Sequence, residues 1–349
     1  MNDVEVSILL PVYNAGQYLK PAVDSVLNQS FKEFELFLID DGSSDGSSEL
    51  CDQYALKDKR VQVIHQKNEG ICCARNNAIK QAKGKYIAFC DHDDLFLPGM
   101  LEKLVFIAEK NDCDIVKCCC EERYIESDKV YYRRIIGPEK DIVYKKEKLG
   151  DAFLFKYTNG YMGYIWDGIY KKEAFIKSGF FNPKMKFGYE DEEIQFRLFR
   201  SINSIAFVKD VFYVHNIRRT FSTSQKYDNN KIESMLWTVE EAIKSVQYLK
   251  LDNKHIEYPA WFVARGLSNV VIEFSMPNCT LKRKEKKEKY KLIRSEKSLE
   301  PYFKFNYLYK VIKQNKKWGI VMLCFYFRAY KLLQLVEIIK KISDKKIKG

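Results

Sequence analysis

The first 120 residues alternate short apolar runs with segments of helical periodicity, and this alternation constrains the fold more than any other feature. Five short, mostly apolar runs occupy residues 4–10, 34–39, 61–65, 86–90 and 114–119. Between them lie segments with apolar side chains at helical spacing, residues 18–29, 49–57, 71–82 and 97–109. Short buried strands that alternate with helices are typical of a mostly parallel sheet covered on both faces. The predicted class is therefore α/β.

The charge of the chain is divided unevenly along the sequence. Over the 349 residues, 59 Lys and Arg face 47 Asp and Glu, a net charge of +12. Residues 281–349 hold 21 of the basic and 6 of the acidic side chains, so the rest of the chain carries a net charge of −3. The sequence therefore predicts a near-neutral globular body and a basic, helical C-terminal region.

Other features of the composition narrow the class of protein. No run of about 18–20 uncharged apolar residues occurs, which argues against a polytopic membrane protein. Residues 1–7 have no basic segment ahead of an apolar one, so we expect no secretory leader. The ten cysteines include adjacent pairs and a triplet rather than the spacing of zinc ligands, and we expect reduced, buried thiols.

An acidic cluster follows the apolar run at residues 86–90. Asp91, Asp93 and Asp94 lie within four residues, where a parallel sheet of this class binds ligands beyond the carboxyl ends of its strands. Carboxylates this close raise one another's pKa unless a cation neutralises them, and hard oxygen ligands select Mg²⁺ or Mn²⁺. The residues alone leave two readings open, a metal site and an Asp-rich turn that caps a helix.

Two further acidic clusters have the same ambiguity. Asp40 and Asp41 end the apolar run at 34–39, where either could accept a hydrogen bond from a nucleotide or simply form a turn. Glu190 and Asp191 begin a run of four acidic residues that opens an amphipathic helix. Acidic residues in a first turn interact well with the helix dipole, but four exceed what capping needs, and one could serve as a general base.

Three segments, in this order and spacing, closely resemble the family 2 glycosyltransferases of the GT-A fold. They read SILLPVYNAGQYLKPAVDSVLNQSFKEFELFLIDDGSSD, NEGICCARNNAIKQAKGKYIAFCDHDD and GYEDEEIQFRL, and the resemblance covers about residues 4–220. It implies a GT-A catalytic domain over residues 1–220, with a nucleotide-binding half at 1–95 and an acceptor half at 96–220. Residues 221–349 form the predicted helical, basic region.

The resemblance also implies roles for residues near the nucleotide. Pro11, Tyr13 and Asp41 would line the nucleotide pocket, with Asp41 bonding the uracil edge. Arg75 would lie near the nucleotide and its diphosphate. The implied donor is a nucleotide sugar, and the resemblance favours UDP over other nucleotides.

The resemblance assigns the chemistry to acidic residues. Asp91 would face the ribose, Asp93 would hold Mg²⁺ or Mn²⁺, and Asp94 would support the sugar or the metal. Asp191 would be the catalytic base, and Glu190 would orient the acceptor or share the proton. The family generally inverts anomeric configuration, so the implied reaction transfers a hexose or N-acetylhexosamine to a glycan or lipid-linked glycan in surface-polysaccharide synthesis.

Three further assignments from the resemblance each have a plainer alternative. His215 would be a third metal ligand, or an ordinary histidine at a strand end. Trp166 would lie near the donor sugar or acceptor, or in the core. Arg218, Arg219 and Ser222 would close over the diphosphate, or form a solvated basic loop.

The basic C-terminal region has an aromatic and apolar character as well. Residues 318–339 are almost wholly apolar except for four polar residues that recur every three positions, Arg328, Lys331, Gln334 and Glu337, and Arg328 interrupts the span. The pattern favours one amphipathic helix in a membrane interface, with the basic residues at 340–348 near anionic headgroups on the cytoplasmic face. The alternative is a helical bundle with solvated lysines.

Other functions fit the sequence less well. An Asp-x-Asp phosphohydrolase normally places its acidic pair after the first strand, whereas Asp91 and Asp93 follow the fourth. A nucleic-acid-binding protein would use the basic region but leave the acidic clusters unexplained, so no nucleic-acid partner is expected. A dehydrogenase is disfavoured because no G-x-G-x-x-G follows a strand.

Overall fold

The chain forms two compact units in this computed structural model. The first comprises residues 1–186 and 190–222, and the second comprises residues 187–189 and 223–349. The structure describes residues 4–159, 163–186, 188–218, 227–252 and 257–346, with side chains as far as residue 338. The roles predicted for residues 1–95 and 96–220 stay predictions.

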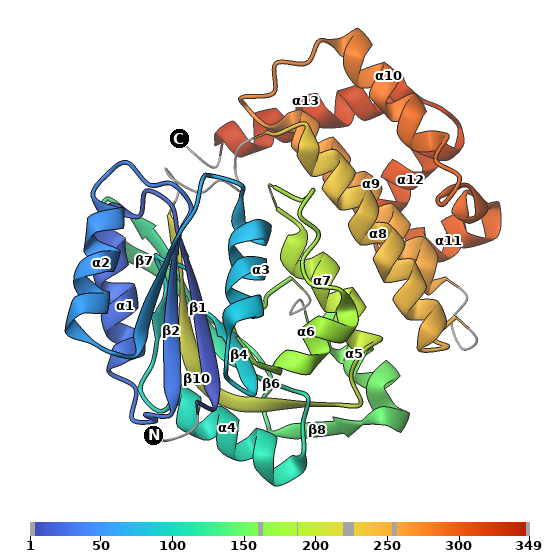
Figure 1. The fold of residues 1–349 in the computed structure, drawn as a ribbon. Helices are drawn as coiled ribbons and strands as arrows, with labels where there is room; N and C mark the ends of the chain where they lie inside the picture. The colour runs from blue at the N-terminus through green and yellow to red at the C-terminus, as the bar shows by residue number, and fades with distance from the viewer. Residues whose placement is uncertain (1–3, 160–162, 187, 219–226, 253–256, 347–349) are drawn as a thin grey trace. The chain divides into compact units, whose positions relative to one another are not determined.

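The first unit is built on one mixed sheet (Figure 1). Its described strands are β1 Val6–Val12, β2 Phe34–Asp40, β3 Val61–His65, β4 Tyr86–Phe89, β5 Leu95–Phe96, β6 Ile115–Glu126, β7 Lys129–Ile136, β8 Ile142–Lys145, β9 Gly168–Lys171 and β10 Ser204–Arg218. They lie in the order β3-β2-β1-β4-β9-β6-β10-β5, and β7 and β8 pair with β6 and β10. The alternating sequence pattern thus predicted the first four strands correctly.

Strand directions bring most carboxyl ends to one edge. Strands β1, β2, β3 and β4 are parallel to one another, and β6 is parallel to β10. Strand β9 is antiparallel to both β4 and β6, so β6 runs in the same direction as β4. The loops that follow β1, β2, β4 and β6 therefore leave the same edge of the sheet.

Helices cover both faces of this sheet. They are α1 Leu19–Leu27, α2 Ser47–Lys57, α3 Ile71–Gln81, α4 Met100–Asn111, α5 Leu149–Thr158, α6 Lys172–Ser178 and α7 Glu190–Phe199. Figure 1 shows α1 and α2 on one face and α3 on the other, beside α6 and α7. Every residue of β1 and β2 is buried, which is why these strands are mostly apolar in sequence.

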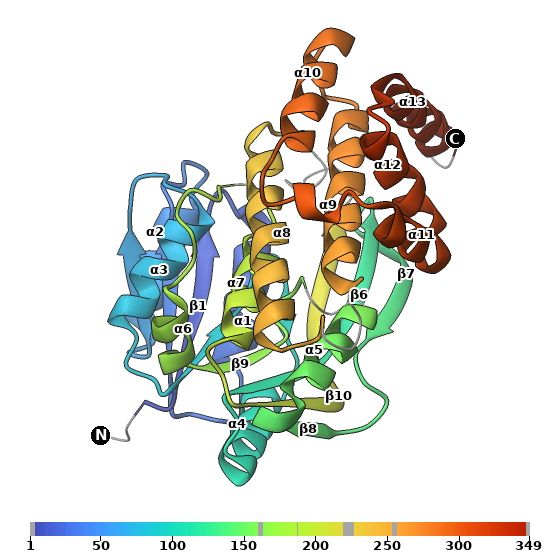
Figure 2. The same cartoon turned by 90° about the vertical axis from the view of Figure 1, so that its right-hand side faces the viewer.

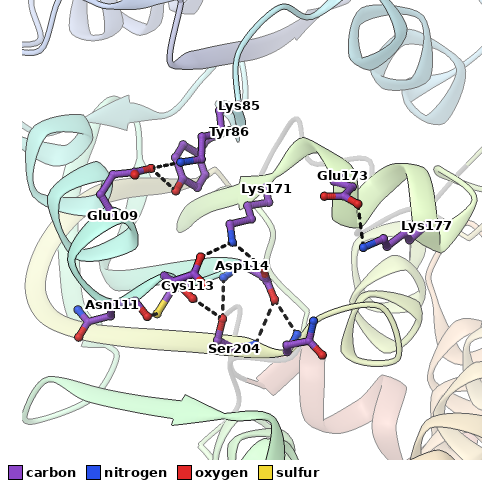
Figure 3. Close-up of polar contacts among 12 residues, drawn as sticks. Lys85, Tyr86, Glu109, Asn111, Cys113, Asp114, Lys171, Glu173, Lys177 and Ser204 are labelled. Carbon is purple, nitrogen blue, oxygen red and sulfur yellow. Dashed lines mark hydrogen bonds and ion pairs between the residues drawn. The ribbon is translucent and has the colours of Figure 1, made fainter.

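A polar cluster joins the strands at the opposite edge of the sheet (Figure 3). The Lys171 side chain pairs with Asp112 and Asp114, at 2.8 and 3.0 Å. The Asp114 carboxylate accepts hydrogen bonds from the backbone N–H groups of Asn203 and Ser204, at the start of β10. These contacts tie the starts of β6 and β10 to the end of β9. They lie at the opposite end of β6 and β10 from the carboxyl ends of these two strands.

The second unit is helical, as the sequence predicts. Its described helices are α8 Asn230–Tyr248, α9 Tyr258–Ser275, α10 Arg283–Arg294, α11 Phe305–Gln314, α12 Lys316–Tyr326 and α13 Tyr330–Lys346. Within this unit α9 contacts α8, α11, α12 and α13, and Figure 2 shows α8 and α9 side by side. Fifteen of the eighteen residues of α9 are buried, so it forms the core of the unit.

The structure corrects one prediction in this unit. Residues 318–339 do not form a single helix, because α12 ends at Tyr326 and α13 begins at Tyr330. Arg328 lies between them with a φ of +54°, and the Ala329 N–H donates to the Cys324 carbonyl to close the turn. Among the residues with described structure, no helix combines the length and the apolar character needed to cross a bilayer.

The predicted burial of the cysteines is largely confirmed. Eight of the ten are buried, including the triplet Cys118–Cys120, and none forms a disulfide within the described part of the chain. Burial raises the pKa of the Cys72 thiol and that of the Cys119 thiol, the latter to about 12. These cysteines therefore behave as small core side chains.

A buried lysine holds the segment that precedes β9, and its loss should destabilise the first unit. The Lys117 ammonium donates to the Tyr164 carbonyl at 2.8 Å and the Tyr170 hydroxyl at 2.7 Å, and it pairs with Asp167. Lys117→Met leaves the buried Asp167 carboxylate unpaired, so the free energy of unfolding should fall by about 3–5 kcal/mol. Denaturant titration followed by circular dichroism measures this loss.

The matched control for that experiment is a lysine in an exposed ion pair. Lys103 pairs with Asp210 at 3.4 Å, and both side chains are more than a third exposed. Lys103→Met should cost less than about 1 kcal/mol, because solvent screens such a pair. Equal losses for the two variants would contradict the structural role assigned to Lys117.

Candidate functional site

Asp41 follows β2 directly, and donors from residues 66–70 bind its carboxylate. Its Oδ1 accepts hydrogen bonds from the Glu69 N–H at 2.9 Å and Gln66 Nε2 at 2.8 Å, and its Oδ2 accepts one from the Gly70 N–H at 2.9 Å. Gly70 has a φ of +92°, a conformation that favours glycine. Asp41 thus positions the turn that opens α3. Its predicted contact with uracil stays a prediction and would require a nucleobase to share these oxygens.

The loop after β1 offers a different environment. Pro11 is buried in β1, where it lies in register with Ile39. Tyr13 is 49% exposed, so its ring is available to a ligand. The adjacent Asn14 carboxamide accepts a hydrogen bond from the Ser44 N–H at 2.9 Å, which ties this loop to the one after β2. The two loops therefore form one continuous rim at the carboxyl edge of the sheet.

The acidic segment after β4 is anchored through Asp94. Its Oδ2 accepts a hydrogen bond from the Tyr213 hydroxyl at 3.0 Å, and its Oδ1 accepts one from the Asn216 N–H at 2.7 Å. The Tyr213 hydroxyl also accepts from the Asp91 N–H at 3.2 Å. Burial raises the pKa of Asp94 well above its usual value, opposed by the charge of His215. Both oxygens are engaged with β10, so Asp94 positions the loop.

Asp93 is paired with an arginine. Its Oδ2 lies 2.9 Å from Arg218 Nη1, and its backbone carbonyl accepts a hydrogen bond from the Asn216 carboxamide at 2.8 Å. The Arg218 guanidinium stacks on the Tyr18 ring, 4.0 Å from its centroid. Of the three residues predicted to close over a diphosphate, Arg218 is placed here, whereas Arg219 and Ser222 lie outside the described residues.

Arg75 joins three acidic residues from distant parts of the chain. It extends from α3, is almost completely buried, and its Nη1 donates to Asp191 Oδ1 at 2.6 Å. Its Nη2 lies 3.3 Å from Asp91 Oδ1, and Nη1 lies 3.6 Å from Glu190 Oε1. The predicted catalytic base, Asp191, and Asp91, which is predicted to face the ribose, therefore contact the same guanidinium.

The rings of two phenylalanines flank this guanidinium. Its central carbon lies 5.6 Å from the Phe89 ring centroid and 5.4 Å from that of Phe181. Phe89 is the last residue of β4, so the strand that leads into Asp91 also supports Arg75 from the side. Such contacts favour a buried cation and hold the guanidinium in one orientation.

The environment of Asp191 suits a base near neutral pH. Burial raises the pKa of Asp191 to about 7; the charge of Arg75 opposes this rise, and the charges of Glu190 and Asp91 add to it. The carboxylate is still 18% exposed, so a substrate can reach it. A carboxylate with a pKa close to the working pH accepts a proton more effectively than an ordinary aspartate.

His215 lies between acidic side chains. Its Nδ1 is 3.9 Å from Glu122 Oε1, too far for a hydrogen bond, and it has no other such partner among the described residues. Burial lowers the pKa of His215, but Glu122, Asp94 and Asp91 outweigh this effect and raise it above its usual value. The imidazole is thus surrounded by negative charge, with one ring nitrogen left without a close partner.

Trp166 lies in an aromatic stack. Its ring stacks on Tyr213, with centroids 4.3 Å apart, and on Tyr164, with centroids 4.5 Å apart. These contacts leave the side chain 3% exposed, so little of its face remains for a sugar. The environment matches the alternative reading of a core residue, and Trp166 supports the hydroxyl of Tyr213 that holds the acidic loop.

The three predicted metal ligands do not converge. Within the described residues, no group of three or more His, Cys, Asp or Glu side chains is arranged to hold an ion. Asp91 and Asp93 are each about one-third exposed and each pair with an arginine. Two carboxylates completed by substrate phosphates are a common environment for Mg²⁺, so this pair fits the protein's share of such a site.

Several residues that shape the site were not predicted from the sequence. Glu122 is buried, and its Oε1 accepts from the Tyr164 hydroxyl while its Oε2 accepts from Arg134 Nε. The side chains of Tyr213 and Asn216 fix the acidic loop. Tyr213 lies two residues before His215 in one strand, so strand alternation could have placed both on one face. No sequence signal marks Glu122, because its role depends on the register between β6 and β10.

Comparison with known proteins relates this chain to one family. The family described as Glycosyl transferase family 2 matches residues 7–176. The glycosyltransferase EpsJ of Bacillus subtilis is 32% identical over 213 residues, which are 60% of this chain and 60% of that protein. The glycosyltransferase GlyG of Streptococcus pneumoniae is 31% identical over 217 residues, covering 61% of this chain and 71% of that protein.

Solved structures agree on the fold. One similar structure is the crystal structure of residues 1–349 of Staphylococcus aureus TarS in complex with UDP-GlcNAc. The superposition covers 98% of this chain and 92% of the TarS chain, with a TM-score of 0.70. The sequence identity is 18%, so the likeness concerns the fold alone. The sheet, its helices and the helical C-terminal unit thus follow the GT-A architecture that the sequence predicts, and the chain belongs to the family 2 glycosyltransferases.

Proposed function

We propose that this chain is an inverting glycosyltransferase that moves a hexose or an N-acetylhexosamine from a UDP sugar to a hydroxyl of a glycan or lipid-linked glycan. The acceptor would belong to surface-polysaccharide synthesis. The observation that carries the proposal is the contact of Arg75 with both Asp91 and Asp191. It brings a carboxylate with a pKa of about 7 close to the acidic loop after β4.

The proposed reaction begins with the acceptor hydroxyl. A sugar hydroxyl is a poor nucleophile, so Asp191 takes its proton as the oxygen attacks the anomeric carbon of the donor. The bond to the diphosphate breaks on the opposite side of that carbon, which inverts its configuration. Glu190 lies beside the base and orients the acceptor or shares the proton.

Positive charge is needed where the diphosphate leaves. Arg218 and Arg75 lie beside the acidic loop, where they pair with Asp93 and Asp91. Asp91 and Asp93 would hold Mg²⁺ or Mn²⁺, which would supply Lewis-acid stabilisation of the leaving group. Tyr13, which is half exposed on the adjoining rim, would contact the nucleotide.

The C-terminal unit presents features of a membrane-binding surface. Phe305, Tyr309, Ile320 and Phe327 are more than half exposed, and the exposed lysines include Lys304, Lys313, Lys316, Lys317 and Lys331. Exposed aromatic residues among lysines suit the interface of an anionic membrane. The proposed location is therefore the cytoplasmic face of the cell membrane, where a lipid-linked acceptor is accessible.

The first prediction concerns the base. Asp191→Asn should lower turnover of a UDP sugar by about 10²- to 10⁴-fold, because the amide cannot accept the proton. UDP affinity, measured by isothermal titration calorimetry, should stay close to that of the unaltered chain. Glu173→Gln, at an exposed helical pair with Lys177, is the control and should leave turnover unchanged.

The pH dependence of kcat/KM tests the electrostatics of the same residue. Because deprotonated Asp191 is the active form, kcat/KM should fall about tenfold per pH unit below the Asp191 pKa of about 7. Glu190→Gln removes a charge that raises this pKa, so the inflection should move to lower pH. Arg75→Gln should move it to higher pH. Near-normal turnover in Asp191→Asn, or shifts in the same direction for both charge variants, would show the assignment of the base to be wrong.

The second prediction concerns the metal. Mn²⁺ should increase the thermal stabilisation that UDP gives to the unaltered chain, and Asp93→Ala should abolish this increase. Arg218→Ala removes the cation that pairs with Asp93, so Mn²⁺ alone should bind this variant more tightly, as measured by electron paramagnetic resonance. Equal Mn²⁺ affinity in Asp93→Ala and the unaltered chain would contradict the proposed site.

The third prediction concerns the membrane. Phe305→Glu combined with Phe327→Glu should abolish co-sedimentation of the full chain with phosphatidylglycerol vesicles, because both side chains are about two-thirds exposed. The control is Leu56→Glu on α2, which is 88% exposed. It should leave co-sedimentation unchanged. Binding that is the same for the double variant and the control would contradict the proposal, and thermal unfolding checks that each variant is folded.

A further inference from the structure

The hairpin formed by β6 and β7 projects from the carboxyl edge of the sheet and exposes aromatic side chains. Every residue of β7 before Ile136 is exposed, and Tyr131 and Tyr132 are each about half exposed. A surface of this kind is uncommon on a strand that serves only to complete a sheet, because exposed aromatic side chains on an outer strand favour the binding of a ligand or another chain.

The pairing of the strands places this hairpin on the side of the acidic loop. Strand β10 pairs with β6 from Ile115 to Ile125 and so occupies one edge of β6 throughout. Strands β9 and β7 must therefore share the other edge. Strand β9 pairs with the first residues of β6, and β7 pairs with the later ones. Strand β7 thus extends the sheet beyond β9, on the side of β4 and Asp91.

A row of residues in register on neighbouring strands runs from the candidate site onto the hairpin. His215, Glu122 and Arg134 lie opposite one another on β10, β6 and β7. The Arg134 Nε donates to Glu122 Oε2 at 2.6 Å, and the Tyr164 hydroxyl donates to the other oxygen. This row leads from a histidine beside Asp94 to an arginine that is almost half exposed.

The next row on the same face is aromatic. Tyr124 on β6 lies opposite Tyr132 on β7, with ring centroids 5.3 Å apart, and Tyr124 is also in register with Ile217. This row lies two rows beyond Tyr213, which holds Asp91 and Asp94. At about 3.3 Å per residue, the separation is about 13 Å along the strand. The tyrosines are therefore within reach of a short chain of sugars that ends at the candidate site.

We propose that Tyr124, Tyr132 and Arg134 form an acceptor platform that binds the sugar residues of a neutral glycan behind its reacting end. This inference rests on the proposed function. A tyrosine offers a rigid apolar ring with a polar hydroxyl and loses little conformational entropy on binding, which suits a ring with apolar faces and polar edges. Arg134 adds donors beside the rings, and its guanidinium carbon lies 6.0 Å from the Tyr124 centroid.

Charge on the hairpin favours a neutral glycan over other partners. Residues 121–136 contain four basic and four acidic side chains. A surface for nucleic acid or an anionic membrane would carry an excess of positive charge. Pairing of β7 with a second copy of the chain is opposed by Lys129, Arg133 and Arg134 on this strand, since charged side chains protect an exposed edge from such pairing.

The test measures oligosaccharide binding and UDP binding on the same full-length variants. The probe is an array of neutral hexose and N-acetylhexosamine oligosaccharides, presented to the chain in the presence of UDP. Tyr132→Ala should weaken binding to the recognised oligosaccharides by about tenfold, and Tyr132→Phe should restore it, because the aromatic ring supplies most of the contact. The control is Tyr248→Ala, at a similarly exposed tyrosine of the C-terminal unit, which should leave oligosaccharide binding unchanged.

Each outcome decides between the proposals. Loss of oligosaccharide binding with unchanged UDP affinity supports the platform. Three results overturn it: no neutral oligosaccharide binds the unaltered chain, Tyr132→Ala binds as tightly as Tyr248→Ala, or Tyr132→Ala instead changes the oligomeric state in gel filtration. Failure of the unaltered chain to bind UDP or any UDP sugar would count against the proposed function itself, independently of the hairpin.

Discussion

The buried charge of Arg75 is the constraint on which the candidate site depends. An unpaired guanidinium in a protein interior costs several kcal/mol, so the carboxylates around it must stay close. They come from different elements: Asp91 follows β4, whereas Glu190 and Asp191 begin α7. Arg75 itself lies on α3, whose first turn is set by Asp41. The requirement to neutralise one cation thus fixes the position of the base relative to the acidic loop.

The same cluster sets the proton affinity of the base. Contact with an arginine alone would keep an aspartate strongly acidic. Burial and two neighbouring carboxylates outweigh this contact and raise the pKa of Asp191 to about 7. A single ion network can therefore hold the carboxylate in place and still leave it basic enough to accept a proton. Fewer acidic neighbours would leave the base well ordered but less basic.

The sequence predicted the elements of this site better than their contacts. Apolar runs that end in acidic residues identified the carboxyl edge, because strand period and topology are local and general. The pairing of Arg75 with Asp191 joins residues 116 positions apart, and it forms only when the folded chain brings α3 and the start of α7 close together. The break at Arg328 was missed because the regular spacing of polar residues that begins at Arg328 suggests a continuous helix, while the backbone turns there with a φ of +54°.

The division of charge along the chain follows from how its ions are paired. In the first unit, acidic side chains at the candidate site are matched by arginines: Arg75 with Asp191, Arg218 with Asp93, and Arg134 with Glu122. Each arginine offsets part of the acidic charge beside it, so a highly charged site lies in a part of the sequence whose net charge is close to zero. In the second unit Lys286 is buried against Glu337, but lysines such as Lys304, Lys313 and Lys316 face solvent. Unmatched charge at a surface persists only where water or an anionic partner stabilises it. The net charge of the chain therefore describes the exposed surface of its C-terminal unit and says little about the acidic chemistry of its candidate site.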